Sequence, residues 1–435
     1  MFLKLGRIPL VVISSPEAAK HVLKTHDLDC CSRPILSGSA KLSYNGLDIA
    51  FAPYGEIWRQ TRKLCVLELF SAKRVQSFQY IREEEVGSLL DSISASSETP
   101  VDLSEKICTF FASVIFRMSC GTAFRGSGLD TERLSEVIPE VESVLGNFCA
   151  GECIPYVGWI IDRLTGHHTK IEKVFRRLDS VFQWIIDDHI NFQGSRRAKE
   201  DIIDVLLRLQ REQVQIGETW LTKNHMKGVL FLAGTDTGAI TVTWAMSELV
   251  RNPRVLKKAQ DEIRNVAGKK ARFVKEEEIG SLEYLRMVLK ETLRLHPPGP
   301  LLVARETMSH FKINGFDIHP KTLIQINAWA IGRDPEYWNS PEEFIPERFA
   351  NNASIDFKGQ HFELLPFGAG RRVCPGIHLA TTTMELLLAN LLYCFDWKLP
   401  RGMKEEDMNM EEAAGQRLDV HKKIPLELVP VNYIM

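Results

Sequence analysis

Ten residues near the end of the chain, FGAGRRVCPG at positions 367–376, constrain the fold more than any other stretch. They place one cysteine, Cys374, between a glycine-rich loop and an apolar helical pattern that begins with Pro375, a natural first helical residue. The start of a helix presents unpaired N–H groups and partial positive charge, which lower the pKa of a neighbouring thiol. The stretch therefore predicts a thiolate at Cys374 that can serve as an anionic ligand.

The glycines of this loop permit turns and close contact with a flat cofactor. A buried free cysteine before an ordinary helix is the alternative, since unpaired cysteines are mostly buried. The spacing Phe-x-x-Gly-x-Arg-x-Cys-x-Gly, however, resembles the haem-binding loop of cytochrome P-450, the haem-thiolate monooxygenases. The resemblance implies haem b as cofactor and Cys374 as its iron ligand. It also implies that further loop residues contact the cofactor, with the aromatic ring shielding the sulfur: Phe367, Gly370, Arg372 and Gly376.

A second motif, AGTDTGAIT at positions 233–241, lies in a pattern that predicts one apolar helix over residues 222–251. Glycines inside a helix each cost about 1 kcal/mol relative to alanine, so the motif needs a local reason. Close packing of two helices is one interpretation. The resemblance implies another, in which Asp236 and Thr237 relay protons to the oxygen that is activated.

This segment also departs from the family pattern. Before the AGTDT element it is shorter by about one helical turn, roughly 5 Å, and Gly238 stands where Ser or Thr is more usual. The shortening falls on the part that lines the substrate pocket, whereas the two relay residues are retained. An inactive truncated isoform that only binds haem is therefore one alternative function.

Three charged residues form a further pattern. Glu291 and Arg294 in KETLRLHPP share one helical face, and PERF adds Arg348. A Glu-x-x-Arg pair alone is common on helix surfaces. The resemblance implies a buried network of the three charges that supports the cysteine loop.

Trp58 and Arg62 share one face of a helix predicted over residues 55–70. A stacked surface pair is one interpretation of them. The resemblance implies that both, with Arg305 and Arg372, neutralise the haem propionates. Nearby basic residues form either a docking face for an acidic reductase or a solvated helix face: Arg59, Lys63, Lys73 and Arg74.

The 435 residues carry a formal net charge of −2, and no basic block or zinc-spaced cluster points to nucleic acid. The nine cysteines are scattered and lack CxxC spacing, so we expect reduced thiols.

Many amphipathic helices, few strands and no βαβ alternation predict a mostly α (α+β) fold with small antiparallel sheets. Residues 1–435 show no linker and are expected to form a single domain, by resemblance a P450 helical bundle around haem.

Several local elements are also predicted. The chain starts in a β-hairpin, residues 32–53 are expected to be a long loop, and Asn314-Gly315 predicts a tight turn between two late strands. No run reaches the roughly 18 apolar residues of a spanning helix. The chain as given is therefore expected to lack the membrane anchor and proline-rich hinge that microsomal plant members carry.

Because the motifs occur in the family's order, the chain is similar to plant A-type (71 clan) cytochrome P-450. The resemblance implies insertion of one atom of O2 into a small lipophilic plant secondary metabolite, such as a terpenoid or phenolic. Electrons would come from NADPH through NADPH-cytochrome P450 reductase. It also implies a monomer on the cytosolic face of the endoplasmic reticulum membrane. The alternatives are a haem-thiolate dehydratase or isomerase that does not use O2, and a haem-binding sensor or carrier.

The expected substrate pocket is mostly apolar. Arg417 within it either meets an acidic group of the substrate or faces water. The lining is expected from residues 37–48, the loop around Pro155, and residues 230–233, 301–303 and 413–418.

Overall fold

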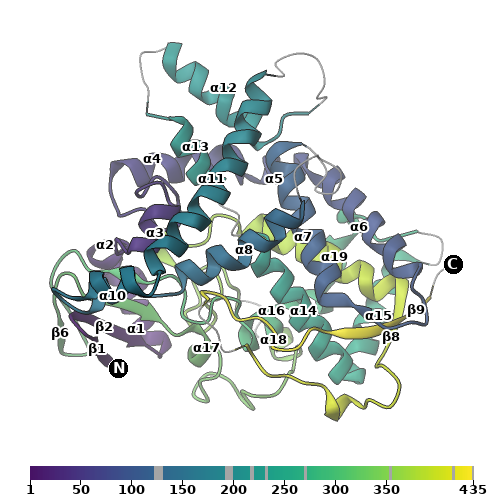
Figure 1. Cartoon of the computed structure of the whole chain (residues 1–435). Helices are drawn as coiled ribbons and strands as arrows, with labels where there is room; N and C mark the ends of the chain where they lie inside the picture. The colour runs from purple at the N-terminus through teal and green to yellow at the C-terminus, as the bar shows by residue number, and fades with distance from the viewer. Residues whose placement is uncertain are drawn as a thin grey trace.

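Helices make up most of the chain, and short strands gather mainly beside the N-terminus (Figure 1). The prediction of a mostly α fold with small sheets is confirmed. Residues 131–136 and 351 are described by their backbone alone. The structure, a computed structural model, describes residues 1–121, 131–191, 199–215, 220–230, 234–268, 272–351, 355–413 and 417–433.

The largest sheet joins the start of the chain to its last third. The hairpin predicted at the N-terminus is confirmed, but the expectation of purely antiparallel sheets is wrong, because β2 and β7 are parallel. A parallel pair requires a long crossover, and here the crossover contains most of the helical body. The strand order is β1 (Phe2–Leu5), β2 (Ile8–Ile13), β7 (Leu323–Ile326) and β4 (Arg305–Glu306).

A second hairpin pairs β5 (Phe311–Ile313) with β6 (Phe316–Ile318). Its two turn residues, Asn314 and Gly315, have φ of 48° and 85°, in agreement with the predicted Asn-Gly turn. The remaining sheet has three strands in the order β3 (Val101–Asp102), β9 (Glu427–Asn432) and β8 (Phe395–Lys398).

Helix α19 (Ile377–Cys394) follows the cysteine loop and runs through the helical body (Figure 1). In its core, Asn390 accepts a hydrogen bond from the Val274 N–H at 2.8 Å and donates to the Val274 carbonyl at 2.9 Å. Among the described helices, α19 has the length and apolar character of a membrane span, but 67% of it is buried inside the protein. Its neighbours include α6 (Gln79–Ser94), α14 (Asp236–Arg251), α15 (Pro253–Ala267) and α16 (Glu283–Leu295).

Helix α7 (Leu103–Cys120) packs along α14 and ends at Gly121, the predicted cap, with φ of 66°. A Cβ at Gly238 of α14 would lie 2.3 Å from Cε1 of Phe111 on α7. The two helices approach this closely only because position 238 is glycine. Close packing therefore explains Gly238.

Two segment predictions are wrong. Residues 32–53 are not one loop, because α3 (Ser37–Leu42) forms there and packs against α8 (Thr131–Leu145) and α11 (His167–Asn191). Tertiary packing of this kind stabilises short helices that weak helix formers would not sustain alone.

The helix predicted over residues 222–251 is the second error. It is divided into α13 (Lys223–Val229) and α14, with Gly234 and Thr235 in a turn and residues 231–233 outside the described part. The low helix propensity of Gly234 favours an end at this point.

The helix predicted over residues 55–70 is confirmed as α4 (Glu56–Leu64), which continues into the π-helical turn η2 (Cys65–Leu69). The other described helical segments are α1 (Pro16–Lys20), η1 (His21–Thr25), α2 (Asp27–Cys30), α5 (Ala72–Ser77), α9 (Ala150–Cys153), α10 (Gly158–Leu164), α12 (Ile202–Gln215), η3 (Glu276–Ser281), α17 (Ala328–Ile331), α18 (Arg348–Asn351), η4 (Gly370–Arg372) and η5 (Glu405–Asp407).

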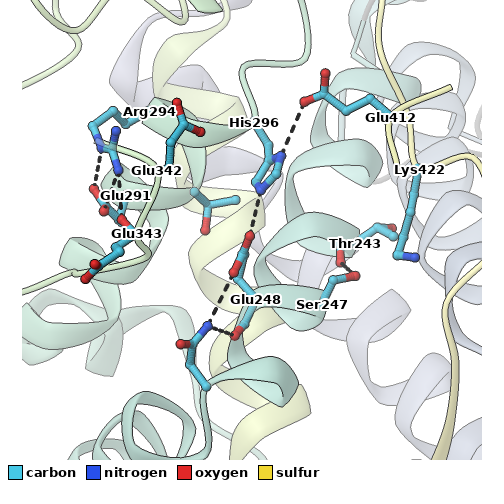
Figure 2. A network of polar contacts seen from close by, with 12 residues as sticks. Thr243, Ser247, Glu248, Glu291, Arg294, His296, Glu342, Glu343, Glu412 and Lys422 are labelled. Carbon is cyan, nitrogen blue, oxygen red and sulfur yellow. Dashed lines mark hydrogen bonds and ion pairs between the residues drawn. The ribbon is translucent and has the colours of Figure 1, made fainter. Parts of the chain in front are cut away.

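A buried polar node joins α14, the end of α16 and the C-terminal segment (Figure 2). His296 contacts Glu248 Oε1 through Nε2 at 2.8 Å, and its Nδ1 faces Glu412 Oε1 at 3.5 Å. Its ring stacks on Trp244 with centroids 4.0 Å apart. The node fixes the C-terminal segment against α14.

Candidate functional site

The cysteine loop folds back on itself, because the N–H of Cys374 donates to the Phe367 carbonyl at 3.0 Å. Arg62 of α4 donates from Nη2 to the Val373 carbonyl at 2.7 Å. Burial raises the pKa of the Cys374 thiol, while the Gly376 N–H and the charge of Arg62 lower it. The predicted lowering of this pKa is wrong, since burial outweighs both. A thiol that binds a metal as thiolate must then release its proton on binding.

Part of the reason lies in where the next helix begins. Helix α19 starts at Ile377 with Gly376 as N-cap, and Pro375 lies in the preceding turn rather than in the helix as predicted. The helix N-terminus is therefore two residues farther along the chain from Cys374 than the sequence indicated.

Gly370 lets the loop rest on the N-terminal helices. Its φ is 70°, and a Cβ there would lie 2.3 Å from the Leu23 carbonyl oxygen and 2.6 Å from Asp27 Oδ1. No side chain fits in that space or favours that backbone conformation. The loop thus gains a close backbone contact with η1 and α2.

Arg372 points away from solvent beside Trp58. Its Nε and Nη2 donate to the carbonyls of Cys31 and Ala52 at 2.8 and 2.7 Å, and Nη1 is buried with no hydrogen-bond partner among the described residues. The guanidinium lies 4.0 Å from the centre of the Trp58 ring. Burial, with the positive charges of other arginines, lowers the pKa of Arg372 to about 9.

Arg33, which no sequence pattern indicated, is buried in the same region. It donates to the carbonyls of Ala50 at 2.9 Å, Val303 at 2.5 Å and Ala304 at 2.9 Å. Burial and the charges of Arg372 and Arg305 lower the pKa of Arg33 well below its ordinary value. The described hydrogen-bond partners of Arg33 are thus carbonyl groups, and none of them is a carboxylate.

Arg305 and Trp58, both expected at the propionates, already have partners in the chain. Arg305 donates to Asp27 Oδ1 at 2.7 Å and to the Ala369 carbonyl at 2.8 Å. The indole N–H of Trp58 donates to the Ile49 carbonyl at 3.1 Å. These contacts fix both side chains next to the cysteine loop.

At the start of α14, Asp236 is paired with a cation. Arg417 Nη2 donates to Asp236 Oδ2 at 2.8 Å and to Asp419 Oδ2 at 3.0 Å, and its Nε donates to Asp419 Oδ1 at 2.6 Å. Burial and the charge of Asp419 raise the pKa of Asp236, whereas Arg417 lowers it. Both expectations for Arg417, a substrate acid or water, must be corrected, because two carboxylates of the chain hold it.

Thr237 is the second residue of α14, directly after Asp236, and its carbonyl accepts a hydrogen bond from the Thr241 hydroxyl at 2.9 Å.

Glu142 of α8 lies near the charges of Asp236, Arg417 and Asp419. Burial and the negative charges of Asp419 and Asp236 raise the pKa of Glu142 to about 8. Of the expected pocket lining, residues 231–233 and 414–416 lie outside the described residues.

Comparison with known proteins identifies the family to which the chain belongs. The family model for cytochrome P450 matches residues 1–422. The chain belongs to the cytochrome P450 family. Two relatives from Arabidopsis thaliana are cytochrome P450 71B35, 52% identical over 435 residues and covering 99% of this chain and 86% of the relative, and cytochrome P450 71B10, 51% identical over 442 residues with coverage of 100% and 87%.

Solved structures show the same fold. A zebra fish cytochrome P450 has a TM-score of 0.82 in a structure with abiraterone and 0.82 in one with progesterone, at 23% and 24% identity. The matches cover 99% of this chain and 95% and 96% of those chains. This P450 is accordingly a plant A-type member, a haem-dependent oxidoreductase of the haem-thiolate monooxygenase class.

The residues of this P450 fit haem. Four buried or half-buried guanidinium groups meet beside the cysteine loop, and their partners are mainly backbone carbonyls. Two carboxylates face them, Asp27 and Asp48, and burial raises the pKa of Asp48 to about 6. A buried surplus of positive charge is costly unless an anion compensates it. The unpartnered Nη1 of Arg372 is available for such an anion, and haem carries two propionates.

The Glu291, Arg294 and Arg348 side chains of this P450 form one network of charges (Figure 2 labels the first two). Arg294 donates to both Glu291 oxygens at 2.8 Å, and Arg348 Nε donates to Oε1 at 2.9 Å. Arg294 also donates to the carbonyls of Gly332 and Pro341 at 2.6 Å. The network ties α16 to the segment that leads into the cysteine loop.

The four basic residues of the expected docking face differ in their surroundings. Lys63 and Lys73 are exposed, whereas Arg59 is exposed but paired with Glu56. Arg74 is half-buried and lies 3.5 Å from Glu200. The surface therefore carries fewer unpaired cations than its sequence suggested.

Proposed function

We propose that this P450 inserts one oxygen atom of O2 into a small lipophilic plant secondary metabolite, with electrons from NADPH delivered by NADPH-cytochrome P450 reductase. The observation that carries the proposal is the group of buried arginines beside the loop of Cys374. Haem held through a thiolate supplies an iron at which O2 is activated. The roles below follow from how the chain's own side chains lie.

Cys374 is the proposed iron ligand. Phe367 is proposed to shield the sulfur, and its ring packs against Phe357 with centroids 5.3 Å apart. Gly376 is proposed to keep the sulfur side of the loop free of a side chain, since a Cβ there would lie 3.9 Å from Cys374 Sγ. Gly370 would act through the packing of the loop on η1 and α2. The propionates would be held by the four arginines Arg33, Arg62, Arg305 and Arg372. Trp58, whose one side-chain N–H donates to the Ile49 carbonyl, is proposed to act there by stacking on Arg372.

Asp236 and Thr237 are proposed to hold and pass protons. Arg417 shares Nη2 between Asp236 and Asp419, so it can keep Asp419 as a partner while the Asp236 carboxyl takes up a proton. Burial, which raises the pKa of Asp236, makes that protonation easier. The Thr237 hydroxyl is one residue away and would receive the proton next. Glu291, Arg294 and Arg348 take a structural role.

The proposed substrate class rests on apolarity. The zebra fish protein was solved with abiraterone and with progesterone, both lipophilic. In this chain the expected pocket segments are mostly apolar, for example Leu230 and residues 301–303. We therefore infer a terpenoid or phenolic substrate rather than a charged one.

Membrane contact is proposed for the surface of α10. Tyr156, Trp159 and Leu164 are 93%, 61% and 82% exposed, which is unusual for side chains of this size. Helix α10 lies beside the first hairpin (Figure 1). Arg7 of that hairpin donates to the carbonyls of Glu152 at 2.7 Å and of Gly151 at 3.0 Å, just before α10.

This surface would meet the cytosolic face of the endoplasmic reticulum membrane. Aromatic and aliphatic side chains of this kind favour the boundary between water and lipid. The reductase would dock elsewhere, near the exposed Lys63 and Lys73. The enzyme is proposed to act as a monomer.

The ligand assignment is tested with Cys374→Ser. The reduced protein with carbon monoxide should lose the thiolate-type absorption band, because serine cannot supply sulfur. Cys65→Ser is the control, since Cys65 is a buried free cysteine on η2, outside the cysteine loop, and its replacement should leave the band intact. A surviving band in Cys374→Ser would overturn the assignment.

Turnover assays separate this function from its alternatives. A monooxygenase requires NADPH, reductase and O2, whereas a dehydratase or isomerase does not use O2. Conversion without O2 would contradict the proposal. A thiolate band with no spin-state change across a broad lipophilic panel would instead favour an inactive isoform or a haem carrier.

A further inference from the structure

Asp27, the first residue of α2, is a buried carboxylate that no motif singled out. It is 3% exposed, and its two oxygens serve different segments. Oδ1 accepts from Arg305 Nη1 at 2.7 Å. Oδ2 accepts from the backbone N–H of Arg371 at 3.0 Å and from Arg371 Nη1 at 2.9 Å. One carboxylate thus joins β4 to the loop three residues before Cys374.

These contacts fix the direction of Arg305. Asp27 holds Nη1, and the Ala369 carbonyl, also in the cysteine loop, holds Nη2 at 2.8 Å. A guanidinium has five N–H donors, so a group held at both ends of its fork keeps further donors for an incoming carboxylate. Its orientation before that carboxylate arrives is set by Asp27 and the loop.

The contacts also affect the charge balance. Among the described residues, Asp27 is the carboxylate that pairs with Arg305, and the neighbouring Arg33 and Arg372 repel that guanidinium. Gly370 allows the loop to approach, since a Cβ there would lie 2.6 Å from Asp27 Oδ1. The carboxylate therefore reduces the positive potential beside the cysteine loop and is held there by the fold.

We propose that Asp27 is a positioning residue for haem, which orients Arg305 toward a propionate and lowers the positive potential at that edge of the cofactor. The inference rests on the proposed function, in which Arg305 contacts a propionate. It assigns Asp27 no contact with substrate or iron.

Replacing Asp27 with asparagine keeps the size of the side chain and removes its charge. The haem edge then carries one more uncompensated positive charge, which favours the reduced state of the iron. The reduction potential of Asp27→Asn should shift in the positive direction. A change in packing alone has no reason to move the potential in that direction.

The experiment is spectroelectrochemical titration of the haem-loaded full chain, with three variants beside the wild type. Asp29→Asn is the matched control, because Asp29 lies on the same helix but pairs with His26 and Ser309. It should leave the potential unchanged. Asp27→Glu keeps the charge and should return most of the shift seen in Asp27→Asn. The carbon monoxide band should stay at the thiolate position in all of them.

An unshifted potential in Asp27→Asn, or equal shifts in Asp27→Asn and Asp29→Asn, overturns the inference. If Asp27→Asn accumulates without haem, Asp27→Glu decides. If Asp27→Glu binds haem at the wild-type potential, the charge of Asp27 is what matters and the inference is supported. If Asp27→Glu also fails to bind haem, the inference is contradicted. A wild-type chain without the thiolate band would contradict the proposed function, whereas a normal band with an unshifted Asp27→Asn contradicts only this inference.

Discussion

Two groups of buried arginines in this P450 look alike in sequence and differ in how their charges are balanced. Arg294 has a bidentate carboxylate partner, Glu291, and its remaining donors reach carbonyls of the chain. At the haem edge, Arg33 and Arg372 have carbonyl partners, lowered pKa values and, at Arg372, an unpartnered nitrogen. The arginines that are neutralised by a carboxylate of the chain stabilise the fold. The arginines that keep a surplus of positive charge can bind an anionic ligand.

The largest expected effect is on the neutralised group. Glu291→Gln leaves the buried Arg294 and the half-buried Arg348 without their anion, and breaking such a pair costs about 3–5 kcal/mol. The free energy of unfolding in urea should fall by that order. Glu283→Gln, an exposed position on the same helix, is the control and should change stability little. A small loss for Glu291→Gln would remove the contrast between the two groups.

The haem-edge group should respond in another property. Arg33→Gln leaves carbonyls of Ala50, Val303 and Ala304 short of a donor, but it also removes one of several mutually repelling cations. We therefore expect a smaller loss of folding stability than for Glu291→Gln. Haem should transfer to apomyoglobin about tenfold faster, as for one lost charge-assisted hydrogen bond. Arg59→Gln, exposed on α4, should retain haem normally. If Arg33→Gln unfolds as readily as Glu291→Gln without faster haem loss, the ligand interpretation fails.

The charges at the start of α14 form an intermediate case, since Arg417 is paired there but carboxylates outnumber it. Thr237→Ala should raise the electrons consumed per product several-fold, because a proton donor is lost. Product and NADPH are measured together once a substrate is known. Thr243→Ala on the same helix is the control. If Thr237→Ala consumes the same number of electrons per product as wild type, Asp236 and its partners have a structural role, like Glu291 and Arg294.

The last effect concerns pH. The pKa of Glu142 is raised to about 8, above the roughly 4.3 of an unfolded chain, so the folded chain holds a proton that the unfolded chain has lost between these values. The free energy of unfolding therefore falls as pH rises through that window. Glu142→Gln should lose less stability than wild type between pH 6 and 8, measured by urea titration.

Glu140→Gln serves as the control for this measurement, because Glu140 lies on the same helix and pairs with Arg177 at 2.9 Å. It should keep the wild-type pH dependence. Equal slopes for wild type and Glu142→Gln would show that the carboxyl is already ionised in the folded chain.

Local patterns predicted what local geometry determines. The hairpin at the chain start, the Asn314-Gly315 turn and the helix of Trp58 follow from neighbouring residues alone. The cysteine loop was recognisable because its spacing is short and fixed, yet the pKa of Cys374 was predicted with the wrong sign, since burial depends on distant segments.

Long-range contacts explain what the sequence did not indicate. Arg33 meets Val303 across 270 positions and Asp27 meets Arg305 across 278, so no periodicity links either pair. Helix α3 exists because α8 and α11 cover it. The parallel pairing of β2 with β7 likewise depends on where the whole helical body returns the chain.

The contact between Arg7 and the segment before α10 has a mechanical consequence. The backbone N–H of Arg7 also donates to the Cys153 carbonyl at 2.8 Å, and a Cβ at Gly6 would collide with that same oxygen, so the first hairpin and α9 are locked together. The first hairpin and the α9–α10 segment should therefore move as one unit. If the exposed surface of α10 contacts a membrane as proposed, that contact would also set the position of the hairpin.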